Sequence, residues 1–509
     1  MIRRKIALAA ALAATAAVAI GVVSLGGPAA KGGSRSEATT PAAGSNAAAF
    51  APPAPPMAWK ACGQDAAQCA VLRVPIDHAD PTGPSIPMAV TRIRARLPKR
   101  RLGVLFVNPG GPGAAGIRFA QLFAGLLDGA VSDRFDIVGF DPRGVGRSAP
   151  IRCVDGPTLD RLQHLDPDPD NAVEIQALLD ASKAFSVACL RRNPRLLAHV
   201  GTLDVVKDLD LLRIAMHEDK ISYFGFSYGT SIGLTYAQLF PGHLRAMVLD
   251  GVLDPAVTMD ERNRQQAIGF ERNLTDFFAD CDKTNKCTFD RGAPPRAAFQ
   301  ALLDRLDKAP LAVGNRSLGP AEFTAAVISQ LYNSSRGWPR LAQLLAAAQR
   351  GNGGPALSRF DAYVDRHADG TYSNTNEANL AVNCLDLQAS HDPAHVQAEA
   401  ERLRSEAPLF GPIAVWYSAP CAYWPVPIVP VPVGNAAGSP PILVVGNTDD
   451  PATPYVWAKE VAARLANAVL VTYDHTGHTA YVSGPPCVRK RVDEYLVKVE
   501  LPAAGIICR

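Results

Sequence analysis

Ser227 stands in a sequence context that suits a nucleophile. Residues Gly225 to Gly229 read G-F-S-Y-G and match the pattern G-x-S-x-G. The apolar run 221–224 before the motif is typical of a buried strand, and the helix-like segment after it ends at Pro241. A tight strand-to-helix turn needs glycine on both sides of the serine and leaves the hydroxyl exposed. Because the pattern also arises by chance, the assignment depends on partners elsewhere in the chain.

Two late loops contain the side chains that a serine nucleophile needs as partners. Asp449 and Asp450 follow one predicted strand, and His475 and His478 follow the last one, 468–472. A histidine takes the proton of the serine hydroxyl, and a carboxylate orients the imidazole. In α/β-hydrolases these partners come in the order Ser, Asp, His, on loops after late strands. The residues alone do not choose between the two aspartates or between the two histidines.

A glycine-rich loop provides a candidate for stabilising an oxyanion. Residues 108–113 read N-P-G-G-P-G and follow the short apolar strand 104–107. Glycines allow a backbone N–H to approach the developing negative charge, and one such donor lowers the barrier by about 3 kcal/mol. A plain turn would have a similar composition, so the strand before this loop and the later serine motif favour the catalytic interpretation. A further loop, 141–148, is interpreted as structural, with its Asp and Arg side chains paired with each other or with neighbouring backbone.

The composition excludes nucleic acid and anionic membranes as partners. The chain of 509 residues is 48% hydrophobic and 19% charged, which is typical of a globular protein with an ample core. Its formal net charge is +3, and Arg3, Arg4 and Lys5 lie in a first segment that contains no acidic residue. The rest of the chain is therefore close to neutral, so it lacks the positive surface that such partners need.

The first thirty residues resemble an export signal. Basic residues at 3–5 precede an apolar stretch at 6–25, and small residues at 28–30 provide a cleavage site. An uncleaved anchor is the alternative, because the apolar stretch is just long enough to span a bilayer. We expect cleavage and a secreted protein that does not stay inserted in the membrane, with retention at the cell surface still open. Residues 31–57 are rich in Ala, Pro, Gly and Ser and predict a flexible linker.

Ten cysteines in an exported chain predict disulfides. A metal site is the alternative, but the chain has no C-x-x-C pair and no histidines close to the cysteines, so we expect no metal. Sequence cannot fix the connectivity, and spacing favours local pairs. The predicted pairs are Cys62 with Cys69, Cys153 with Cys189, Cys281 with Cys287, Cys384 with Cys421, and Cys487 with Cys508.

Strands that alternate with helices predict an α/β fold with a mostly parallel sheet covered by helices on both faces. From about residue 255 helical periodicity dominates, and the strand pattern returns near residue 442. The middle of the chain is therefore interpreted as an inserted helical cap. The predicted division is a signal at 1–30, a linker at 31–57, a first core part at 58–254, a cap at 255–434 and a second core part at 435–509.

Five motifs in this order resemble the exported tripeptidyl aminopeptidases of actinobacteria, which are related to the proline iminopeptidases within the α/β-hydrolase fold. The likeness extends from Trp59 to the C-terminus, and two cap segments at 383–386 and 421–425 share it. The loop at 108–113 lacks the histidine of the iminopeptidases' HGGPG motif, which makes cleavage only after proline a weaker expectation. The five motifs are NPGGPG (108–113), DPRGVGRS (141–148), GFSYGT (225–230), DPATP (450–454) and GHTAY (477–481).

The resemblance implies one choice at each ambiguous position. The family's acid precedes the proline of its D-P-x-T-P motif, which corresponds to Asp450, and its base follows the glycine of G-H, which corresponds to His478. The implied oxyanion donors are the backbone amides of Tyr228 and Gly111, with Gly110 as the alternative.

The resemblance also implies a substrate. The family cleaves peptides with a free N-terminus, which a carboxylate in the cap could bind, and Asp386 is the candidate. A structural aspartate beside a disulfide is the alternative for this residue. We therefore expect a monomeric, exported serine exopeptidase without a cofactor, which acts on the N-termini of peptides or proteins and releases short peptides, tripeptides by resemblance. An esterase or lipase that uses the same residues, and a catalytically silent binding protein, are the rival hypotheses.

Overall fold

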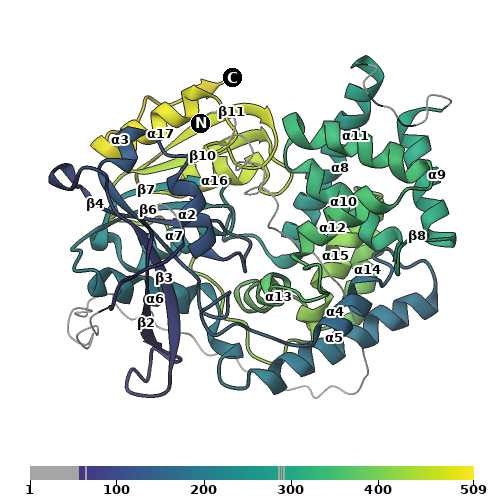
Figure 1. The fold of residues 1–509 in the computed structure, drawn as a ribbon, viewed down its shortest axis with the longest axis horizontal. Helices are drawn as coiled ribbons and strands as arrows, with labels where there is room; N and C mark the ends of the chain where they lie inside the picture. Colours follow the sequence, from purple (N-terminus) through teal and green to yellow (C-terminus); the bar gives the residue numbers. More distant parts are fainter. Residues whose placement is uncertain (1–56, 64–65, 285–286, 288, 290–292) are drawn as a thin grey trace, which may run out of the picture.

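The computed structural model describes residues 57–63, 66–284, 287, 289 and 293–509. The predicted export signal and all of the predicted linker except Met57 lie outside the described residues. The described chain forms two bodies that lie side by side, a core built around a sheet and a body of helices (Figure 1).

One sheet with ten strands within the described residues forms the centre of the core. Its order is β1-β2-β3-β5-β4-β6-β7-β10-β11-β12. From β5 to β12 in this order neighbouring strands run parallel, whereas β1, β2 and β3 pair antiparallel at one end. The strands are β1 Lys60–Ala61, β2 Gln68–Pro75, β3 Ser85–Ile93, β4 Gly103–Asn108, β5 Phe135–Phe140, β6 Ile221–Phe226, β7 Leu244–Asp250, β10 Ile442–Asp449, β11 Ala468–Thr476 and β12 Ile507–Cys508.

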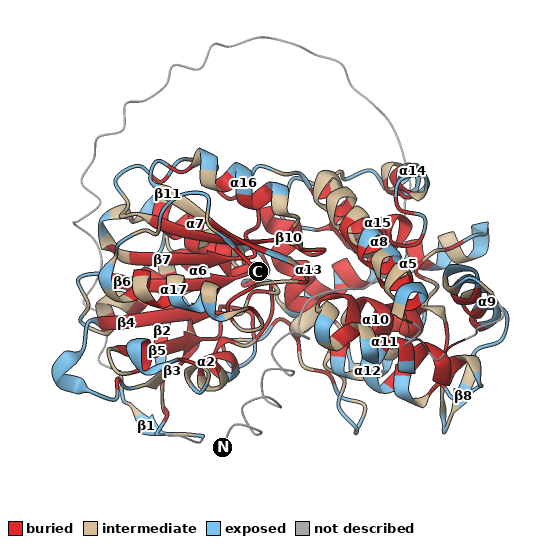
Figure 2. Cartoon of the chain, turned by 90° about the horizontal axis from the view of Figure 1, so that it is seen from above, coloured by how far each residue is buried: buried red, intermediate tan, exposed pale blue. Residues whose placement is uncertain are grey.

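Helices cover both faces of the sheet, as the sequence predicts. In the fully buried strand β4, Val104 and Phe106 belong to one hydrophobic cluster, while Leu105 and Val107 belong to the other. Successive side chains of a strand point to opposite faces, so an entirely apolar strand must be covered twice. One face packs against α2 (Gly116–Ala124), α3 (Gly129–Ser132) and α17 (Pro486–Lys498); the other packs against α6 (Thr202–Ala215), α7 (Gly229–Leu239) and α16 (Tyr455–Arg464). Figure 2 shows the buried strands between these helices.

The inserted segment folds as a helical cap. It leaves the core after β7 and returns to it at β10. A short hairpin of β8 (Leu311–Val313) and β9 (Arg316–Leu318) interrupts its helices. The helices are α8 Met259–Thr284, α9 Pro295–Lys308, α10 Pro320–Leu331, α11 Ser334–Gln349, α12 Gly354–Val364, α13 Thr375–Asp386, α14 Pro393–Arg404, α15 Phe410–Ser418 and the 3-10 turn η4 Ala419–Tyr423.

Two helices from the predicted first core part pack on the cap instead of the sheet. These are α4 (Gly156–Gln163) and α5 (Ala172–Arg192), which lie beside the cap helices in Figure 1. Leu178 and Leu179 of α5 share a hydrophobic cluster with residues of α14, α15 and η4. The sequence pattern of an amphipathic helix shows that one face is buried, but not against which partner. The cap is therefore assembled from segments on both sides of Ser227 in the chain.

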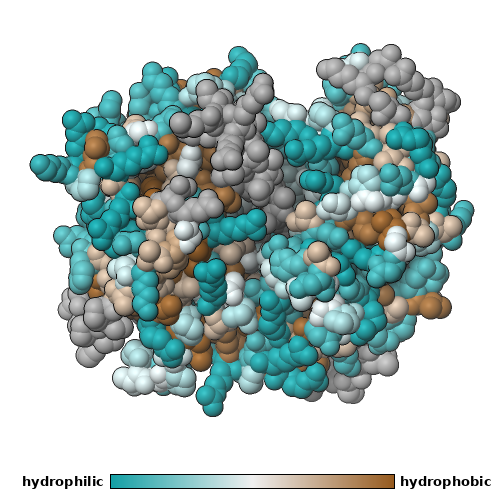
Figure 3. All heavy atoms as spheres, in the orientation of Figure 1, coloured by the Kyte–Doolittle hydropathy of each residue, from teal (hydrophilic) through white to brown (hydrophobic). Residues whose placement is uncertain are grey.

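All five predicted disulfide pairings are confirmed. The bridges join Cys62 to Cys69, Cys153 to Cys189, Cys281 to Cys287, Cys384 to Cys421 and Cys487 to Cys508. Two of these bridges lie wholly within the part of the chain that was predicted to be the cap. Within the described ranges, the structure has no helix that is apolar and long enough to cross a bilayer, and no cluster of three or more potential metal ligands. The face in Figure 3 is mostly hydrophilic, with scattered apolar patches.

Candidate active site

Ser227 occupies a strained turn between β6 and α7. Its φ of 52° lies in the left-handed region, which residues other than glycine rarely adopt. A Cβ on Gly225 would lie 2.3 Å from the carbonyl oxygen of Gly229, and one on Gly229 would lie 2.7 Å from that of Asn108. Both flanking glycines are therefore required sterically, and the G-x-S-x-G match forms a nucleophile elbow.

The glycine-rich loop lies directly against the elbow. A Cβ on Gly110 would lie 2.8 Å from the amide nitrogen of Tyr228 and 3.0 Å from the Cβ of Ser227. The amide of Gly110 itself donates to Oδ1 of Asn108 at 2.9 Å, so it is occupied. The amides of Gly111 and Tyr228 have no acceptor among the described residues. The geometry favours Gly111 over Gly110 as the second oxyanion donor.

Asp450 holds the imidazole of His478. Nδ1 of the histidine lies 2.9 Å from both carboxylate oxygens of Asp450, and the carboxylate is buried. Backbone amides of Ala452 and Thr453 and the hydroxyl of Thr453 also donate to Asp450 at 2.8–2.9 Å. A carboxylate at Nδ1 fixes the tautomer that leaves Nε2 as a proton acceptor, which is what a general base needs.

The competing aspartate and histidine are engaged elsewhere. Asp449 forms an ion pair with Arg272 of α8, with a distance of 3.1 Å between Nη2 and Oδ1. His475 stacks on Tyr473, and burial lowers the pKa of this histidine. The geometry thus brings together the pair that the family resemblance implies, Asp450 with His478.

The serine and the histidine are not joined by a hydrogen bond in this structure. Nε2 of His478 is buried and has no hydrogen-bond partner among the described residues. His478 nevertheless lies beside the turn that follows β7, where a Cβ on Gly251 would be 3.2 Å from its Cε1. The amide of Ser227 donates to the carbonyl oxygen of Asp250, the residue before that glycine, at 3.0 Å. Ser227 and His478 therefore both lie beside the end of β7, without a hydrogen bond between them.

Asp250 positions the loop after β11 that contains His478, called here the histidine loop. The sequence does not reveal this role. Its buried carboxylate accepts the backbone amides of Ala480 at 2.9 Å and of Tyr481 at 2.8 Å. Burial raises the pKa of Asp250 to about 6. One feature of the sequence could have indicated this role: Asp250 is a charged residue at the carboxyl end of a buried parallel strand. Such a group must find hydrogen-bond partners in the neighbouring loops.

The cap contacts all three loops of the site. The amide of His478 donates to the carbonyl oxygen of Tyr332, just beyond α10, at 2.8 Å. Asn379 of α13 donates to the carbonyl oxygen of Pro112 at 3.0 Å, and Gln266 of α8 donates to that of Ala452 at 2.6 Å. The cap therefore contacts the histidine loop, the glycine-rich loop at 108–113 and the loop after β10 that contains Asp450, each through a different helix or helix end.

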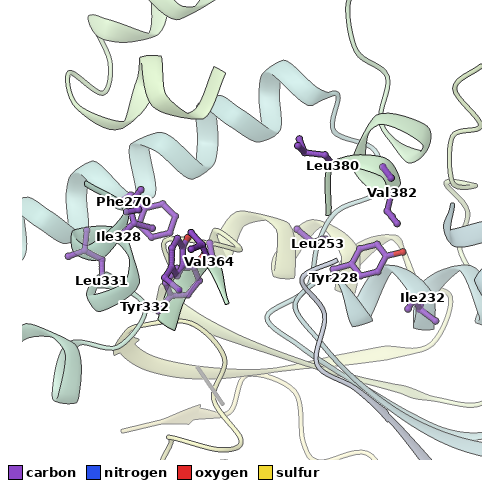
Figure 4. Close-up of a cluster of buried hydrophobic side chains, with 14 of the residues drawn as sticks. Tyr228, Ile232, Leu253, Phe270, Ile328, Leu331, Tyr332, Val364, Leu380 and Val382 are labelled. Atoms are coloured by element: carbon purple, nitrogen blue, oxygen red, sulfur yellow. The ribbon is translucent and has the colours of Figure 1, made fainter. Parts of the chain in front are cut away.

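A pocket of about 730 Å³, including its open mouth, lies between the core and the cap. Ser227 and Gly111 line it from the core side. Figure 4 shows Phe270, Ile328 and Tyr332 grouped on the cap side and Leu253 with Tyr228 on the core side. A site that is largely apolar with a few polar groups is typical of small-substrate binding. The full lining is Gly111, Ser227, Leu253, Arg262, Asn263, Gln266, Ala267, Phe270, Ile328, Tyr332, Asn379, Phe410, Ile413, Ala414, Tyr417 and Ala452.

Asp386 does not line this pocket. Its two carboxylate oxygens accept the amide of Thr202 at 2.9 Å and the hydroxyl of Thr202 at 2.5 Å. That hydroxyl also lies 2.5 Å from the phenol oxygen of Tyr228. Burial raises the pKa of Asp386 to about 7. The contacts of this carboxylate thus join α13 to α6 and to the elbow, and its role in binding a substrate amine stays a prediction.

The loop at 141–148 makes structural contacts. Asp141 accepts the amides of Ile117 and Arg147, both at 3.0 Å. The buried Arg143 forms an ion pair with Asp208 at 2.6 Å and donates to the carbonyl oxygens of Pro75, Ile76 and His199. The aspartate and the arginine are not paired with each other. Both are paired with neighbouring backbone, as the sequence interpretation allows.

Comparison with known proteins places the chain in a family. A family model described as TAP-like protein matches residues 407–508. The serine protease Hip1 of Mycobacterium tuberculosis is 35% identical over 479 residues, which cover 89% of this chain and 91% of that protein. The tripeptidyl aminopeptidase of Streptomyces lividans is 32% identical over 473 residues, which cover 88% of this chain and 86% of that protein. The chain belongs to the tripeptidyl-aminopeptidase-like family of α/β-hydrolases.

The family's names agree on the chemical class but differ in substrate. A carboxylesterase B of Mycobacterium tuberculosis is 36% identical over 474 residues, which cover 89% of this chain and 90% of that protein. Proteases, aminopeptidases and carboxylesterases all hydrolyse acyl bonds, and this member of the tripeptidyl-aminopeptidase-like family is a serine hydrolase of the same type. Its five disulfides fit a protein that reaches an oxidising compartment.

Proposed function

We propose that the protein is an exported serine exopeptidase that releases short peptides from free N-termini. The observation that carries this proposal is the strained Ser227 beside the pocket, with His478 held by Asp450 near the same turn. The relatives named as a protease and an aminopeptidase support peptides as the substrate. The basic and apolar segment at 1–30 and the five disulfides support export.

The mechanism follows from the roles of the three side chains. Oγ of Ser227 attacks the scissile carbonyl carbon while Nε2 of His478 takes its proton, and Asp450 stabilises the resulting imidazolium. The amides of Gly111 and Tyr228 donate to the oxyanion of the tetrahedral intermediate. His478 then protonates the leaving amine. In the second half, His478 takes a proton from a water molecule, the water oxygen attacks the acyl carbon, and His478 returns the proton to Oγ of Ser227 as the acyl product leaves.

A free substrate amine needs acceptors at the far end of the pocket. No lining residue is acidic, so neutral amide oxygens of the cap are the acceptors that the pocket offers. The carboxamide nitrogen of Gln266 donates to the core, and that of Asn263 donates to Ser418 at 2.8 Å. Their oxygens have no partner among the described residues and are available to an ammonium group. By closing the cleft, the cap would limit how many substrate residues fit between the scissile bond and the substrate's N-terminus.

Three chromogenic substrates test the proposal: a tripeptide anilide with a free amine, its N-acetylated twin, and a short acyl ester. Wild type and Ser227→Ala are compared on each. We expect cleavage of the free tripeptide only, with kcat reduced by at least about 1,000-fold in the variant, because a triad without its nucleophile retains little activity. Equal cleavage of the acetylated twin would contradict the free-amine requirement. Serine-dependent cleavage of the ester alone would instead identify an esterase.

A further inference from the structure

Arg262 lines the pocket as a cation that forms no ion pair with an acidic side chain among the described residues. It lies on α8 and lines the same pocket as Ser227. One of its nitrogens, Nη1, donates to Oδ1 of Asn383 at 2.8 Å. Nε and Nη2 have no hydrogen-bond partner among the described residues. A guanidinium has five N–H donors in a planar fork, so most of its donor capacity is left for a bound group.

The surroundings do not neutralise this charge. None of the residues that line the pocket is acidic. The carboxylate of Asp386 is close enough to act on Arg262 electrostatically, but it is hydrogen-bonded to Thr202, and burial raises its pKa to about 7. Burial lowers the pKa of Arg262, because a guanidinium that is partly withdrawn from water loses hydration. A partly buried guanidinium with free donors can bind a carboxylate through charge-assisted hydrogen bonds, which are stronger than neutral ones.

Two other cap arginines on the same helix behave differently. Arg264 forms ion pairs with Glu261 and Glu406, and Arg272 forms an ion pair with Asp449. The spacing of Arg262, Gln266 and Phe270 by four residues places these three on one face of α8, and all three line the pocket. The unpaired arginine is therefore the one that faces the site.

We propose that Arg262 is a specificity-determining residue that binds a carboxylate of the substrate through Nε and Nη2. The substrates are then acidic peptides. The carboxylate belongs either to an Asp or Glu side chain within the released segment or to the C-terminus of a short substrate. This inference rests on the proposed peptidase function for its catalytic readout, and a binding experiment tests it without catalysis.

The catalytic test compares matched substrates on matched variants. Tripeptide anilides that carry Glu or Gln at each of the three positions separate a charge from its neutral isostere. Free-acid and amidated tetrapeptides test the C-terminal source. The variants are Arg262→Gln, Arg262→Lys, which keeps the charge but not the fork, and Arg264→Gln, which removes the same charge two residues away at an existing ion pair.

We expect wild type to favour one Glu substrate, or the free acid, by at least about 10-fold in kcat/KM, mainly through KM. Arg262→Gln should abolish this preference, Arg262→Lys should keep part of it, and Arg264→Gln should leave it unchanged. A preference at a single peptide position identifies the side chain as the source, whereas a preference for the free acid identifies the C-terminus. Equal preferences in wild type and Arg262→Gln would overturn the proposal.

Calorimetry on Ser227→Ala separates this inference from the proposed function. The same tripeptides, as free products, are titrated into this variant and into a Ser227→Ala, Arg262→Gln double variant. Tighter binding of the acidic peptide that depends on Arg262 would support the anion site even if no peptide were hydrolysed. Indistinguishable binding of the Glu and Gln peptides and of free-acid and amidated peptides would overturn the anion site even if the peptidase function were correct.

Discussion

The carboxylate of Asp250 accepts the backbone amide of Tyr481 at 2.8 Å and thereby fixes the loop that carries His478 to the end of β7. The same strand end supplies the carbonyl oxygen that accepts the amide of Ser227 at 3.0 Å. One residue thus holds the serine turn through its backbone and the histidine loop through its side chain. Its position explains how two loops that are far apart in the chain keep a common geometry.

Asp250→Asn should lower kcat by about 10- to 100-fold with a smaller change in KM, because a shifted imidazole loses alignment with the serine. The amide group offers one oxygen where two were used, and its N–H₂ faces a backbone N–H. Steady-state kinetics on the free tripeptide anilide measure the effect. Asp493→Asn is the control, because among the described residues the Asp493 carboxylate accepts only the phenol of Tyr481, at 2.7 Å, and the amide of the variant keeps an acceptor oxygen. Equal losses in both variants would contradict a specific role for Asp250.

Gly110→Ala should abolish activity and destabilise the protein. Its φ is 93°, and the added Cβ would lie 2.5 Å from the carbonyl oxygen of Phe226 and 2.8 Å from the amide of Tyr228, which is a proposed oxyanion donor. Gly351→Ala is the control, because its φ is 84° but, apart from its two chain neighbours, no described residue has an atom within 4 Å of its added Cβ. The control should lose about 1–2 kcal/mol from backbone strain alone and keep its kcat. Similar kinetics in the two variants would show that the close approach to the elbow is not needed.

Asp386 should make the protein less stable as the pH rises from about 4 to about 7. Burial raises its pKa from 3.8 to about 7, so the folded protein binds a proton that the unfolded chain has released in this interval. Stability is therefore greatest below the unfolded pKa and falls until the folded pKa is passed, by up to about 4 kcal/mol in total.

Melting temperatures of wild type and Asp386→Asn at pH 5, 6, 7 and 8 measure this dependence. The amide does not titrate, so the variant should show a shallower decline than wild type. Asp180→Asn, at an exposed position of α5, should follow the wild-type decline. Parallel curves for wild type and Asp386→Asn would contradict the assignment of the proton to this carboxylate.

Local chemistry in the sequence predicts much of this protein. The glycines on both sides of Ser227 cannot be replaced by a residue with a Cβ, because that atom would clash with nearby backbone. The alternation of buried strands with amphipathic helices predicts a parallel sheet with helices on both faces. Local spacing also paired all ten cysteines correctly. These features show in the sequence because residue type, periodicity and the spacing of cysteines are displayed there directly.

Contacts between distant segments were decided only by the tertiary structure. The residues alone did not distinguish Asp449 from Asp450, and only the family resemblance favoured Asp450. The structure gives the physical reason, because Asp449 forms an ion pair with Arg272 of the cap while Asp450 binds His478. Three further features were likewise invisible in the sequence: α5 packs on the cap, Asp250 binds the loop that carries His478, and Arg262 has no acidic neighbour among the described residues that line the pocket. A buried charge is defined by what surrounds it, and in this fold its surroundings come from segments up to hundreds of residues away in the chain.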